Sequence, residues 1–501
     1  MLIMTSLSNS APRTGRGLSL RKRSKRMVGW FLLCAFLAAG AVVSITVIID
    51  PLQFYHKVTW YTPRFSTEER YQNPGLAKNW DYDTIVIGTS MTENFLPSVV
   101  GKELGGTVMK LSMEGSTADE HNKMAKVALG TGKVKKILWG LDYFSLKSNS
   151  ADESSKFPDY MYDDKLWNDY PYLFNYSVYE QFINDIKAKR KGMKQQNLEY
   201  LYNWNRMVTY GKAKVAKTYA TANEGEVYFG LNEEPLEVVK KSFENNILSL
   251  VKAHPEVEFN FYYPPYSVLR QVVWYNTNPG RFENQIEMRK WMYEQFAQYP
   301  NVKLYDFQAA GEWTYDLDLY KDLSHHKQDV NTWIAEAIGR DDAAYRVTDA
   351  NIDVLNDRIE KDAETAILNK DNDVVNVSVS LDGQSLVFTN RVLAEGDSGN
   401  ELLVPVKQAA AALGAELSWD QPTKTVSLRK DGHEVRMIVD AMVATVDGSK
   451  VDMAYAPKLV GGTALVPVSF VFKQMGWNVD VAQPDAKTTV IAIASSSASA
   501  K

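Results

Sequence analysis

Two short stretches of the chain hold residue types that together could carry out nucleophilic catalysis. Ser90 lies in "DYDTIVIGTSMTENF", directly after a β-branched apolar run, and Asp322 precedes His325 by three positions in "KDLSHH". A serine nucleophile needs a base to take its proton and a carboxylate to orient that base. The alternative is structural, because Ser90, Asp322 and Ser324 are also favoured caps of helix N-termini.

An α/β sheet is predicted to position these residues. Strands are predicted at 84–87, 107–111, 136–139, 258–263 and 302–305, and helices at 117–129, 236–253 and 281–299. Short apolar strands that alternate with amphipathic helices are typical of a mostly parallel sheet covered on both faces. Ser90 would then sit on a strand-to-helix turn, near the positive end of the next helix. An aromatic, helical insertion at about 149–233 interrupts the alternation, and such insertions commonly shape the ligand site.

Four blocks in order along the chain resemble the SGNH (GDSL-like) hydrolase superfamily. They are Gly88-Thr89-Ser90 after the first strand, Gly115 in "LSMEGST", Asp142 in "WGLDYF", and the Asp322-x-x-His325 motif. The resemblance implies a flavodoxin-like three-layer domain over about residues 50–340. It also implies a nucleophile at Ser90, a general base at His325 and an orienting carboxylate at Asp322, with Gly115 in the oxyanion hole.

The third block departs from the family pattern, because Asp142 stands where asparagine is expected. An ionised aspartate accepts hydrogen bonds only and repels an oxyanion, and a lost donor costs roughly 3–4 kcal/mol of transition-state stabilisation. Either Asp142 is protonated, or another donor such as Asn94 or the amide of Gly115 or Ser90 serves, or the enzyme is slow or inactive. In this divergence the chain resembles membrane-anchored proteins related to alanyl-teichoic-acid and alginate-acetylation factors more than secreted lipases.

Other residues are candidates for the same pocket. Arg70, in "RYQNPGLAKN", could pair with an anionic group of a ligand. The stretch "FYYPPYSVLRQ" could place Tyr266, Ser267 or Arg270 at the carboxyl edge of the sheet, or it could be a Pro-fixed turn with exposed polar residues. His326 is expected to face solvent. The α/β-hydrolase elbow, the P-loop and the dinucleotide fingerprint are all absent after the first strand.

The N-terminal region predicts a membrane as partner and argues against nucleic acid. Residues 1–26 carry seven basic and no acidic side chains, which is a charge of +7. Because the whole chain has a net charge of −5, the remaining residues carry −12. The 23 uncharged residues at 27–49 would form a helix of about 34 Å, enough to cross a bilayer. A cleaved signal peptide is the alternative. We expect an uncleaved single-pass anchor, with the N-terminus in the cytoplasm and residues 50–501 outside.

The cysteine content excludes an intrachain disulfide, because the only cysteine, Cys34, lies in the span at 27–49. A disulfide-free protein of this layout resembles those of Gram-positive bacteria.

The C-terminal part contains an internal repeat. "LDGQSLVF" recurs as "VDGSKVDM", and "LLVPVKQAAAALG" as "ALVPVSFVFKQMG", which predicts a two-repeat α+β domain at 374–496 after a linker at 341–373 and before a tail at 497–501. These residues resemble the copper amine oxidase N-terminal-like domain. A copper amine oxidase needs three His ligands and a cofactor-forming tyrosine. This domain has one histidine, His433, and the chain lacks "NYD" and "NYE". We therefore expect no metal and no cofactor.

Together these features predict an extracytoplasmic, membrane-anchored serine esterase or O-acyltransferase that acts on a cell-envelope polymer. A cell-wall or envelope polysaccharide is the expected partner, and a membrane acyl-transfer protein is a further candidate. The alternative is a catalytically degenerate SGNH-like protein that binds wall glycan or scaffolds an acylation complex. The replacement of asparagine by Asp142 favours that alternative.

Overall fold

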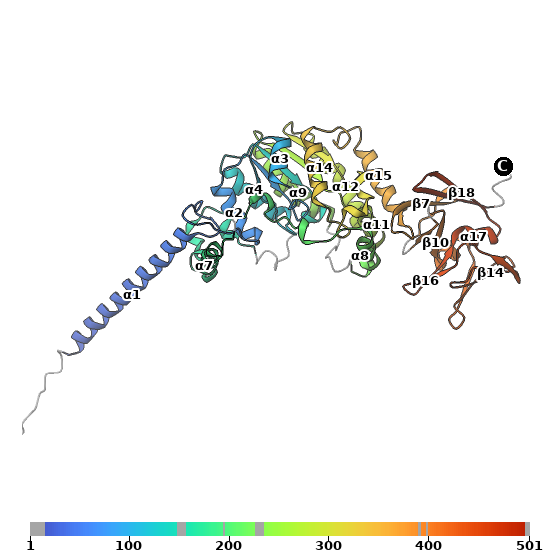
Figure 1. The fold of residues 1–501 in the computed structure, drawn as a ribbon, viewed down its shortest axis with the longest axis horizontal. Coiled ribbons are helices and arrows are strands. Elements are labelled where there is room, and N and C mark those ends of the chain that lie inside the picture. The colour runs from blue at the N-terminus through green and yellow to red at the C-terminus, as the bar shows by residue number, and fades with distance from the viewer. Residues whose placement is uncertain are drawn as a thin grey trace, which may run out of the picture. The chain divides into compact units, whose positions relative to one another are not determined.

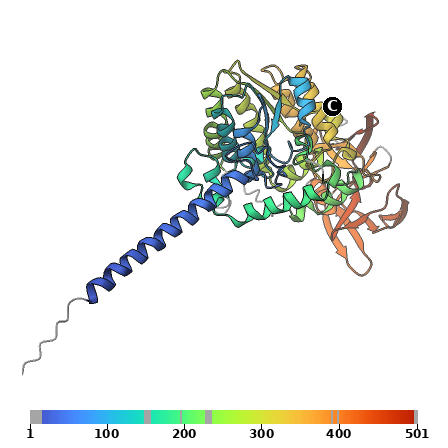
Figure 2. The same ribbon diagram turned by 60° about the vertical axis from the view of Figure 1, so that its left-hand side comes forward.

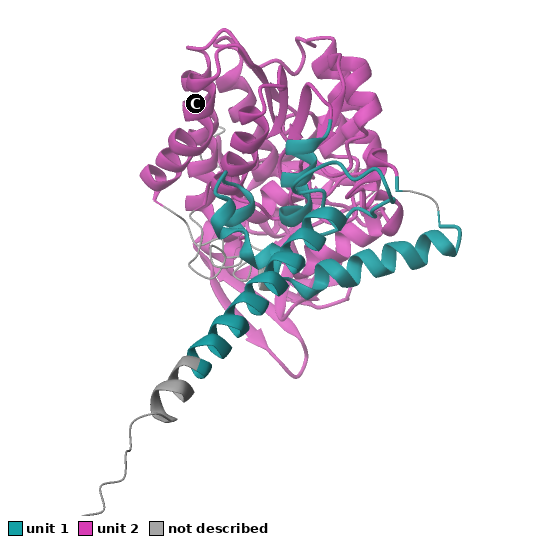
Figure 3. Cartoon of the chain, turned by 90° about the vertical axis from the view of Figure 1, so that its left-hand side faces the viewer, with its two compact units in different colours: residues 1–80, 158–196 teal, residues 81–157, 197–501 magenta. Residues whose placement is uncertain are grey.

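The computed structural model describes residues 16–147, 157–193, 196–225, 235–388, 392–396 and 399–495, and these form two compact units (Figure 3). Unit 1 comprises residues 1–80 and 158–196, and unit 2 comprises residues 81–157 and 197–501. The predicted insertion at 149–233 is therefore divided, because its first described part belongs to unit 1 and its second part to unit 2.

Unit 1 is built around α1 (Arg16–Ile49), one continuous helix drawn in blue (Figure 2). Its segment Arg23–Ile49 is long and apolar enough to cross a membrane, a property that a signal sequence shares. The other helices of unit 1 are α2 (Glu69–Asn79), η2 (Asp159–Met161), η3 (Leu166–Asn168), α6 (Tyr170–Leu173) and α7 (Tyr176–Arg190). Ile49, Phe54 and Tyr172 are buried in a common cluster, so the end of α1 is packed against the α6 region.

Unit 2 contains the predicted parallel sheet. Its strands are β1 (Thr84–Ile87), β2 (Val108–Lys110), β3 (Lys136–Gly140), β4 (Glu258–Tyr263) and β5 (Val302–Asp306). They pair in the order β2-β1-β3-β4-β5, and every pair is parallel. This is the doubly wound order of flavodoxin-like sheets, in which ligands bind beyond the carboxyl ends of the strands where the order reverses. Here the order reverses between β1 and β3.

Helices cover both faces of this sheet. They are α3 (Pro97–Leu104), α4 (Ala118–Gly130), α8 (Lys212–Gly225), α9 (Leu236–Phe243), η7 (Glu244–Leu248), α10 (Ser249–Ala253), α11 (Val268–Thr277), α12 (Pro279–Phe296) and α14 (Gln328–Gly339). On one face, Val86 and Leu138 pack with apolar residues of α3, α11 and α14. On the other face, Phe261 stacks on Phe296 of α12 with ring centroids 4.4 Å apart. Neighbouring residues of a strand point to opposite faces, which explains why these strands are mainly apolar rather than alternating.

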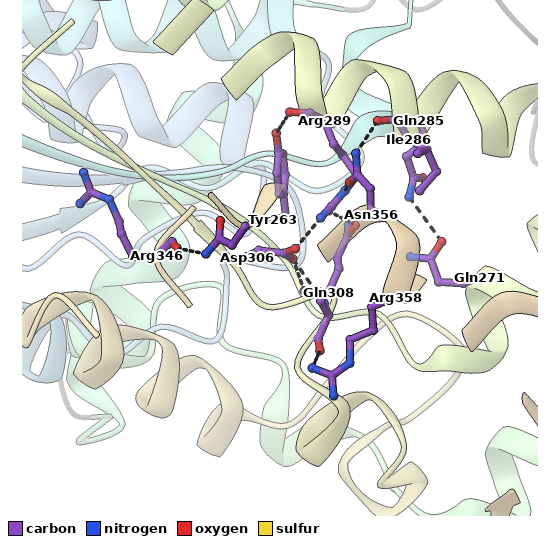
Figure 4. Close-up of polar contacts among 12 residues, drawn as sticks. Tyr263, Gln271, Gln285, Ile286, Arg289, Asp306, Gln308, Arg346, Asn356 and Arg358 are labelled. Carbon is purple, nitrogen blue, oxygen red and sulfur yellow. Dashed lines mark hydrogen bonds and ion pairs between the residues drawn. The ribbon is translucent and has the colours of Figure 1, made fainter. Parts of the chain in front are cut away.

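The predicted connector contains a helix, α15 (Ile352–Thr365), that is held to the sheet by a buried arginine (Figure 4). Arg289 of α12 donates from Nε to Asn356 Oδ1 of α15 at 2.8 Å, and it forms an ion pair with Asp306 at the end of β5. The Arg289 and Asp306 side chains are 1% and 0% exposed, so their charges must be paired. The network fixes α15 on the α/β domain.

The C-terminal part, coloured orange to red, consists mainly of strands (Figure 1). The strands are β6 (Ala366–Leu368), β7 (Val374–Leu381), β8 (Gln384–Ser385), β9 (Leu393–Glu395), β10 (Glu401–Pro405), β11 (Glu416–Asp420), β12 (Thr425–Lys430), β13 (His433–Ile438), β14 (Val443–Val446), β15 (Ser449–Asp452), β16 (Lys458–Val460), β17 (Thr463–Pro467), β18 (Asn478–Asp485) and β19 (Thr488–Ala494). The repeated Val-Pro motifs end β10 and β17, which pair antiparallel and lead into α16 (Val406–Leu413) and α17 (Val468–Gln474).

Candidate active site

Ser90 lies on an irregular turn at the carboxyl end of β1. Gly88 precedes it with φ +153°, and a Cβ there would lie 2.5 Å from Thr92 Cγ2, so the close approach of Thr92 requires glycine. Successive hydrogen-bonded turns follow, in which Thr92 N donates to Thr89 O at 2.9 Å. The turn holds Ser90 at the point where the strand order reverses.

Both readings of Ser90 placed a helix directly after it, and the structure has turns there instead. The next helix, α3, begins at Pro97 with Leu96 as its N-cap residue. Proline favours the first helical position, because its φ is already helical and its missing N–H would have no partner there. Ser90 therefore neither caps a helix nor lies at a helix N-terminus, and its hydroxyl is available for another partner.

That partner is His325. Ser90 Oγ lies 2.9 Å from His325 Nε2, and His325 Nδ1 lies 2.9 Å from Asp322 Oδ2. Asp322 Oδ1 also accepts hydrogen bonds from the backbone amides of Ser324 and His325, each at 2.8 Å. These amides hold the carboxylate beside its imidazole partner. The arrangement gives the Ser90 proton a path to an oriented imidazole.

The environment keeps Asp322 ionised. Burial alone would raise the pKa of this carboxyl, but the hydrogen bond and charge attraction of His325 and the two backbone amides outweigh burial and lower the pKa below its ordinary value. The Asp322 and His325 side chains are 31% and 26% exposed, so the pair is open to a ligand from solvent.

Asp142 is buried beside this turn and bonds to two hydroxyl groups. It follows β3, and its carboxylate accepts hydrogen bonds from Thr89, which follows β1, and from Tyr266, which follows β4. Burial raises the pKa of Asp142, whereas the two hydrogen bonds and the nearby His325 oppose that rise. Both carboxylate oxygens are therefore engaged inside the protein, and the residue connects the ends of three neighbouring strands.

The turn after β4 does not expose its polar residues, contrary to one of the two readings of this stretch. Tyr266 and Ser267 are buried, and Ser267 Oγ donates to Leu323 O at 2.7 Å. Arg270 Nε donates to Ser324 Oγ at 3.0 Å, next to His325. Ser267 and Arg270 therefore hold the Asp322-x-x-His325 segment through hydrogen bonds.

Trp204 belongs to the site, although the sequence did not single it out. Its ring meets the His325 ring edge to face, with centroids 5.7 Å apart, and its Nε1 donates to Ser90 O at 3.4 Å. Lys321 Nζ lies 4.1 Å from the centre of the Trp204 ring. Trp204 comes from the part of the predicted insertion that lies in unit 2. The only signal available from the sequence was the general rule that such insertions shape ligand sites, and this rule does not point to Trp204 or to any other single residue.

The predicted oxyanion and substrate residues fall in different places. Gly115 is exposed on the loop after β2, with φ +60°, and this loop is held at the same sheet edge by the bond from Met113 N to Gly88 O at 2.9 Å. The Asn94 side chain is buried, and neither its Nδ2 nor its Oδ1 has a hydrogen-bond partner among the described residues. Arg70 lies in α2 of unit 1, and its pairing with an anionic group of a ligand stays a prediction.

The expectation that His326 faces solvent is wrong, because its side chain is buried. A bridge between Tyr320 and His326 turns its side chain inward, where burial lowers its pKa to about 4. Its Nδ1 contacts Lys327 O at 3.2 Å, and its Nε2 has no partner among the described residues. Within the described part of the chain, no group of three or more His, Cys, Asp or Glu side chains is placed to hold a metal ion.

The geometry and the comparisons define the class of the chain in two parts. The first is a mixed α/β protein with a five-stranded parallel sheet and one N-terminal apolar helix. The second is a copper amine oxidase N-terminal-like domain, because residues 380–491 match the family model described as the copper amine oxidase N-terminal domain.

Two further comparisons add little to this classification. No curated protein matches the chain. Among solved structures, the chain is similar to one described as "a putative platelet activating factor" from Streptococcus pneumoniae, with 13% identity and a TM-score of 0.29 over 55% of this chain and 91% of that one. A likeness this low does not assign the SGNH fold.

Proposed function

We propose that the chain is a membrane-anchored serine esterase or O-acyltransferase of the SGNH type that acts on a cell-envelope polymer. The observation that carries the proposal is the line from Ser90 Oγ through His325 to Asp322, with both hydrogen bonds at 2.9 Å. A linked serine, histidine and carboxylate is the arrangement that activates a hydroxyl as a nucleophile.

In the proposed reaction, Ser90 Oγ attacks the carbonyl carbon of an O-acyl ester while its proton moves to His325 Nε2. The charge of Asp322 stabilises the resulting imidazolium and holds its Nδ1–H in place. When the tetrahedral intermediate collapses, His325 returns the proton to the departing alkoxide and leaves an acyl group on Ser90. Water or a sugar hydroxyl then attacks this acyl-enzyme, with His325 again acting as base, and the acceptor distinguishes hydrolysis from transfer.

The oxyanion is assigned to backbone donors rather than to Asp142. Both oxygens of Asp142 accept hydrogen bonds from Thr89 and Tyr266, so the residue has no free donor to offer. The amides of Ser90 and Gly115 are the candidates, since both residues lie at the carboxyl edge of neighbouring strands β1 and β2. Loss of one oxyanion donor costs about 10²–10³ in kcat, so an enzyme that depends on two amides would be slow but active.

The proposed setting is the outer face of the membrane. A basic segment at 1–26 precedes a helix that is long enough to span the bilayer, and this order supports a cytoplasmic N-terminus. The anchor would hold the catalytic domain close to envelope polymers, and the C-terminal domain would supply adhesion to them. A cell-wall polysaccharide is the proposed substrate, and a membrane acyl-transfer protein is the proposed donor partner in the transferase version.

Hydrolysis of 4-nitrophenyl acetate by the full chain in detergent tests the proposal. Wild type is expected to turn over this ester, and Ser90→Ala is expected to lower kcat by at least about 10³-fold. Ser449→Ala serves as the matched control, because Ser449 is exposed in β15 of the C-terminal domain. Failure of wild type to hydrolyse any aryl ester or transfer any acyl group would contradict an enzymatic function.

The alternative is a degenerate domain that binds wall glycan or scaffolds an acylation complex. The presence of Asp142 where the family has asparagine favours this alternative, because both carboxylate oxygens accept hydrogen bonds and offer an oxyanion no donor. A pull-down with purified wall polysaccharide separates the two functions. The binding function predicts equal retention of wild type and Ser90→Ala, with no turnover by either.

A further inference from the structure

Five large aromatic side chains of unit 1 are exposed near the outer end of α1. Their exposed fractions are 53% for Trp60, 77% for Trp167, 64% for Tyr170, 53% for Phe174 and 77% for Tyr176. We call these five residues the aromatic patch. Four of the five lie on the short segment 167–176, and exposed apolar groups that gather in this way commonly mark an interaction surface. Tyr172 of the same segment points inward instead, and its hydroxyl donates to Asp50 Oδ1 at 2.7 Å. The segment therefore has a packed side and an exposed side.

Hydrogen bonds hold the chain around Leu173 and Tyr179, and Trp60 itself, at one level of α1. Thr46 Oγ1 donates to Leu173 O at 2.9 Å, and Tyr179 OH donates to Val42 O at 3.0 Å. Trp60 Nε1 donates to Ile48 O at 3.0 Å. Trp60 and the part of the patch around Leu173 are thus held beside the last two turns of α1. In Figure 3, the second long teal helix, α7, leaves the end of α1 sideways rather than continuing its direction.

The depth of this level in a bilayer follows from the sequence, on the proposed premise that α1 spans the membrane. The last basic residue before the apolar run is Arg26. A hydrocarbon layer of about 30 Å takes about 20 helical residues, so a span that begins at Met27 reaches the far boundary near Thr46. Thr46 is the residue to which the α6 segment is bonded. The aromatic patch then lies where hydrocarbon meets headgroups, the level at which Trp and Tyr side chains are enriched.

We propose that the aromatic patch is a second membrane contact, which inserts into the headgroup region of the outer leaflet beside the spanning helix. Trp and Tyr suit this region because their rings are apolar and their N–H or O–H groups bond to headgroups and water. A single helix allows the attached domain to tilt and rotate. A second contact restricts both motions and sets unit 1 at a defined height above the lipid.

The native cysteine makes this proposal testable in the full chain. Cys34 lies in the predicted span and is exposed on α1, so a nitroxide attached to it reports whether α1 is in the bilayer. In a Cys34→Ser background, Tyr176→Cys and Trp167→Cys carry the same nitroxide at two patch positions whose side chains are both 77% exposed. Power-saturation EPR in nanodiscs of phosphatidylcholine and phosphatidylglycerol compares collisions with oxygen and with a water-soluble nickel chelate. The free nitroxide in buffer supplies the aqueous reference.

The expected result is a deep position for the Cys34 label and a shallow, interfacial position for both patch labels, with nickel collisions reduced several-fold from the aqueous reference. Patch labels that collide with nickel like the free nitroxide, while the Cys34 label is deep, would overturn the second contact and leave the anchor intact. A Cys34 label in water would overturn both the anchor and the second contact. The two exposed positions guard against misfolding of one variant.

Discussion

Ser90 Oγ and His325 Nε2 lie 2.9 Å apart, although 235 positions of the chain separate the two residues. β1 delivers the serine, and the histidine follows β5 through α13 (Gly311–Thr314) and η8 (Leu317–Leu319). Two strands, β3 and β4, lie between β1 and β5 in the sheet. The contact therefore depends on the complete domain, and substitutions at its supports should change catalysis in specific ways.

The first prediction concerns the orientation of the histidine. Asp322→Asn should lower kcat for an aryl acetate by on the order of 10²–10⁴-fold, because an amide favours the wrong tautomer of the imidazole. The KM should change little, because the ligand does not need Asp322 for binding. Steady-state kinetics on wild type and Asp322→Asn measure this, and a kcat within twofold of wild type would show that Asp322 has no part in the reaction.

Asp322 should also affect stability in a direction set by its pKa. The folded-state pKa lies below the ordinary value, so the unfolded chain binds the proton first as pH falls. The stabilisation is therefore present above about pH 4 and is lost below it. Unfolding of wild type and Asp322→Asn between pH 3 and 7 should show a stability difference that shrinks in acid.

The second prediction concerns Trp204, which contacts both His325 and the backbone of Ser90. Trp204→Ala should lower kcat about tenfold or more, because a misplaced catalytic group carries a large rate penalty. Trp204→Phe should recover part of this loss, since it restores the ring contact but not the hydrogen bond. Trp419→Ala is a matched control, because Trp419 is 38% exposed in β11. Equal activity of all four proteins would remove Trp204 from the site.

The third prediction concerns Asp142 as an anchor of the serine turn. Asp142→Ala leaves the buried hydroxyls of Thr89 and Tyr266 without their acceptor and should destabilise the domain by about 1–3 kcal/mol. Asp142→Asn keeps one acceptor and should cost less. Denaturant unfolding gives both values. If the alanine variant is at least as stable as the asparagine variant, the carboxylate does not anchor the turn.

The fourth prediction concerns His326, which is buried and neutral. Its folded-state pKa of about 4 lies below the ordinary value of about 6.5, so the unfolded chain takes up a proton first as the pH falls. Stability is lost progressively from about pH 6.5 to pH 4, by roughly 3 kcal/mol in total. His326→Gln does not titrate and should lack this part of the pH dependence. Parallel pH profiles in wild type and variant would contradict the assignment.

The sequence predicted the sheet well because its evidence is local. The run Thr84–Ile87 is β-branched, apolar and followed by glycine, and the structure places β1 at these residues. The Asp322-x-x-His325 motif was also visible, because three positions suffice to bring the two side chains to one turn. Patterns of this kind depend on neighbouring residues, and the structure keeps them.

Three features of the site region were not predicted from the sequence. Trp204 reaches His325 from an insertion more than a hundred positions away, and no periodicity marks such a contact. His326 is turned inward by its bridge to Tyr320, so its polarity alone suggested exposure wrongly. The start of α3 has a local signal in Pro97, because proline favours the first helical position. Long-range packing therefore explains the Trp204 contact, whereas the other two features depend on residues nearby in the chain.

The most direct test of the account is to locate the adduct of a fluorophosphonate probe on the full-length chain by peptide mass spectrometry. The account predicts one adduct, on Ser90, that is lost in Ser90→Ala and strongly reduced in His325→Ala, because only an activated serine reacts with the probe. Ser449→Ala should label like wild type. An unlabelled wild-type chain, or an adduct on another residue that persists in Ser90→Ala, would contradict Ser90 as the nucleophile.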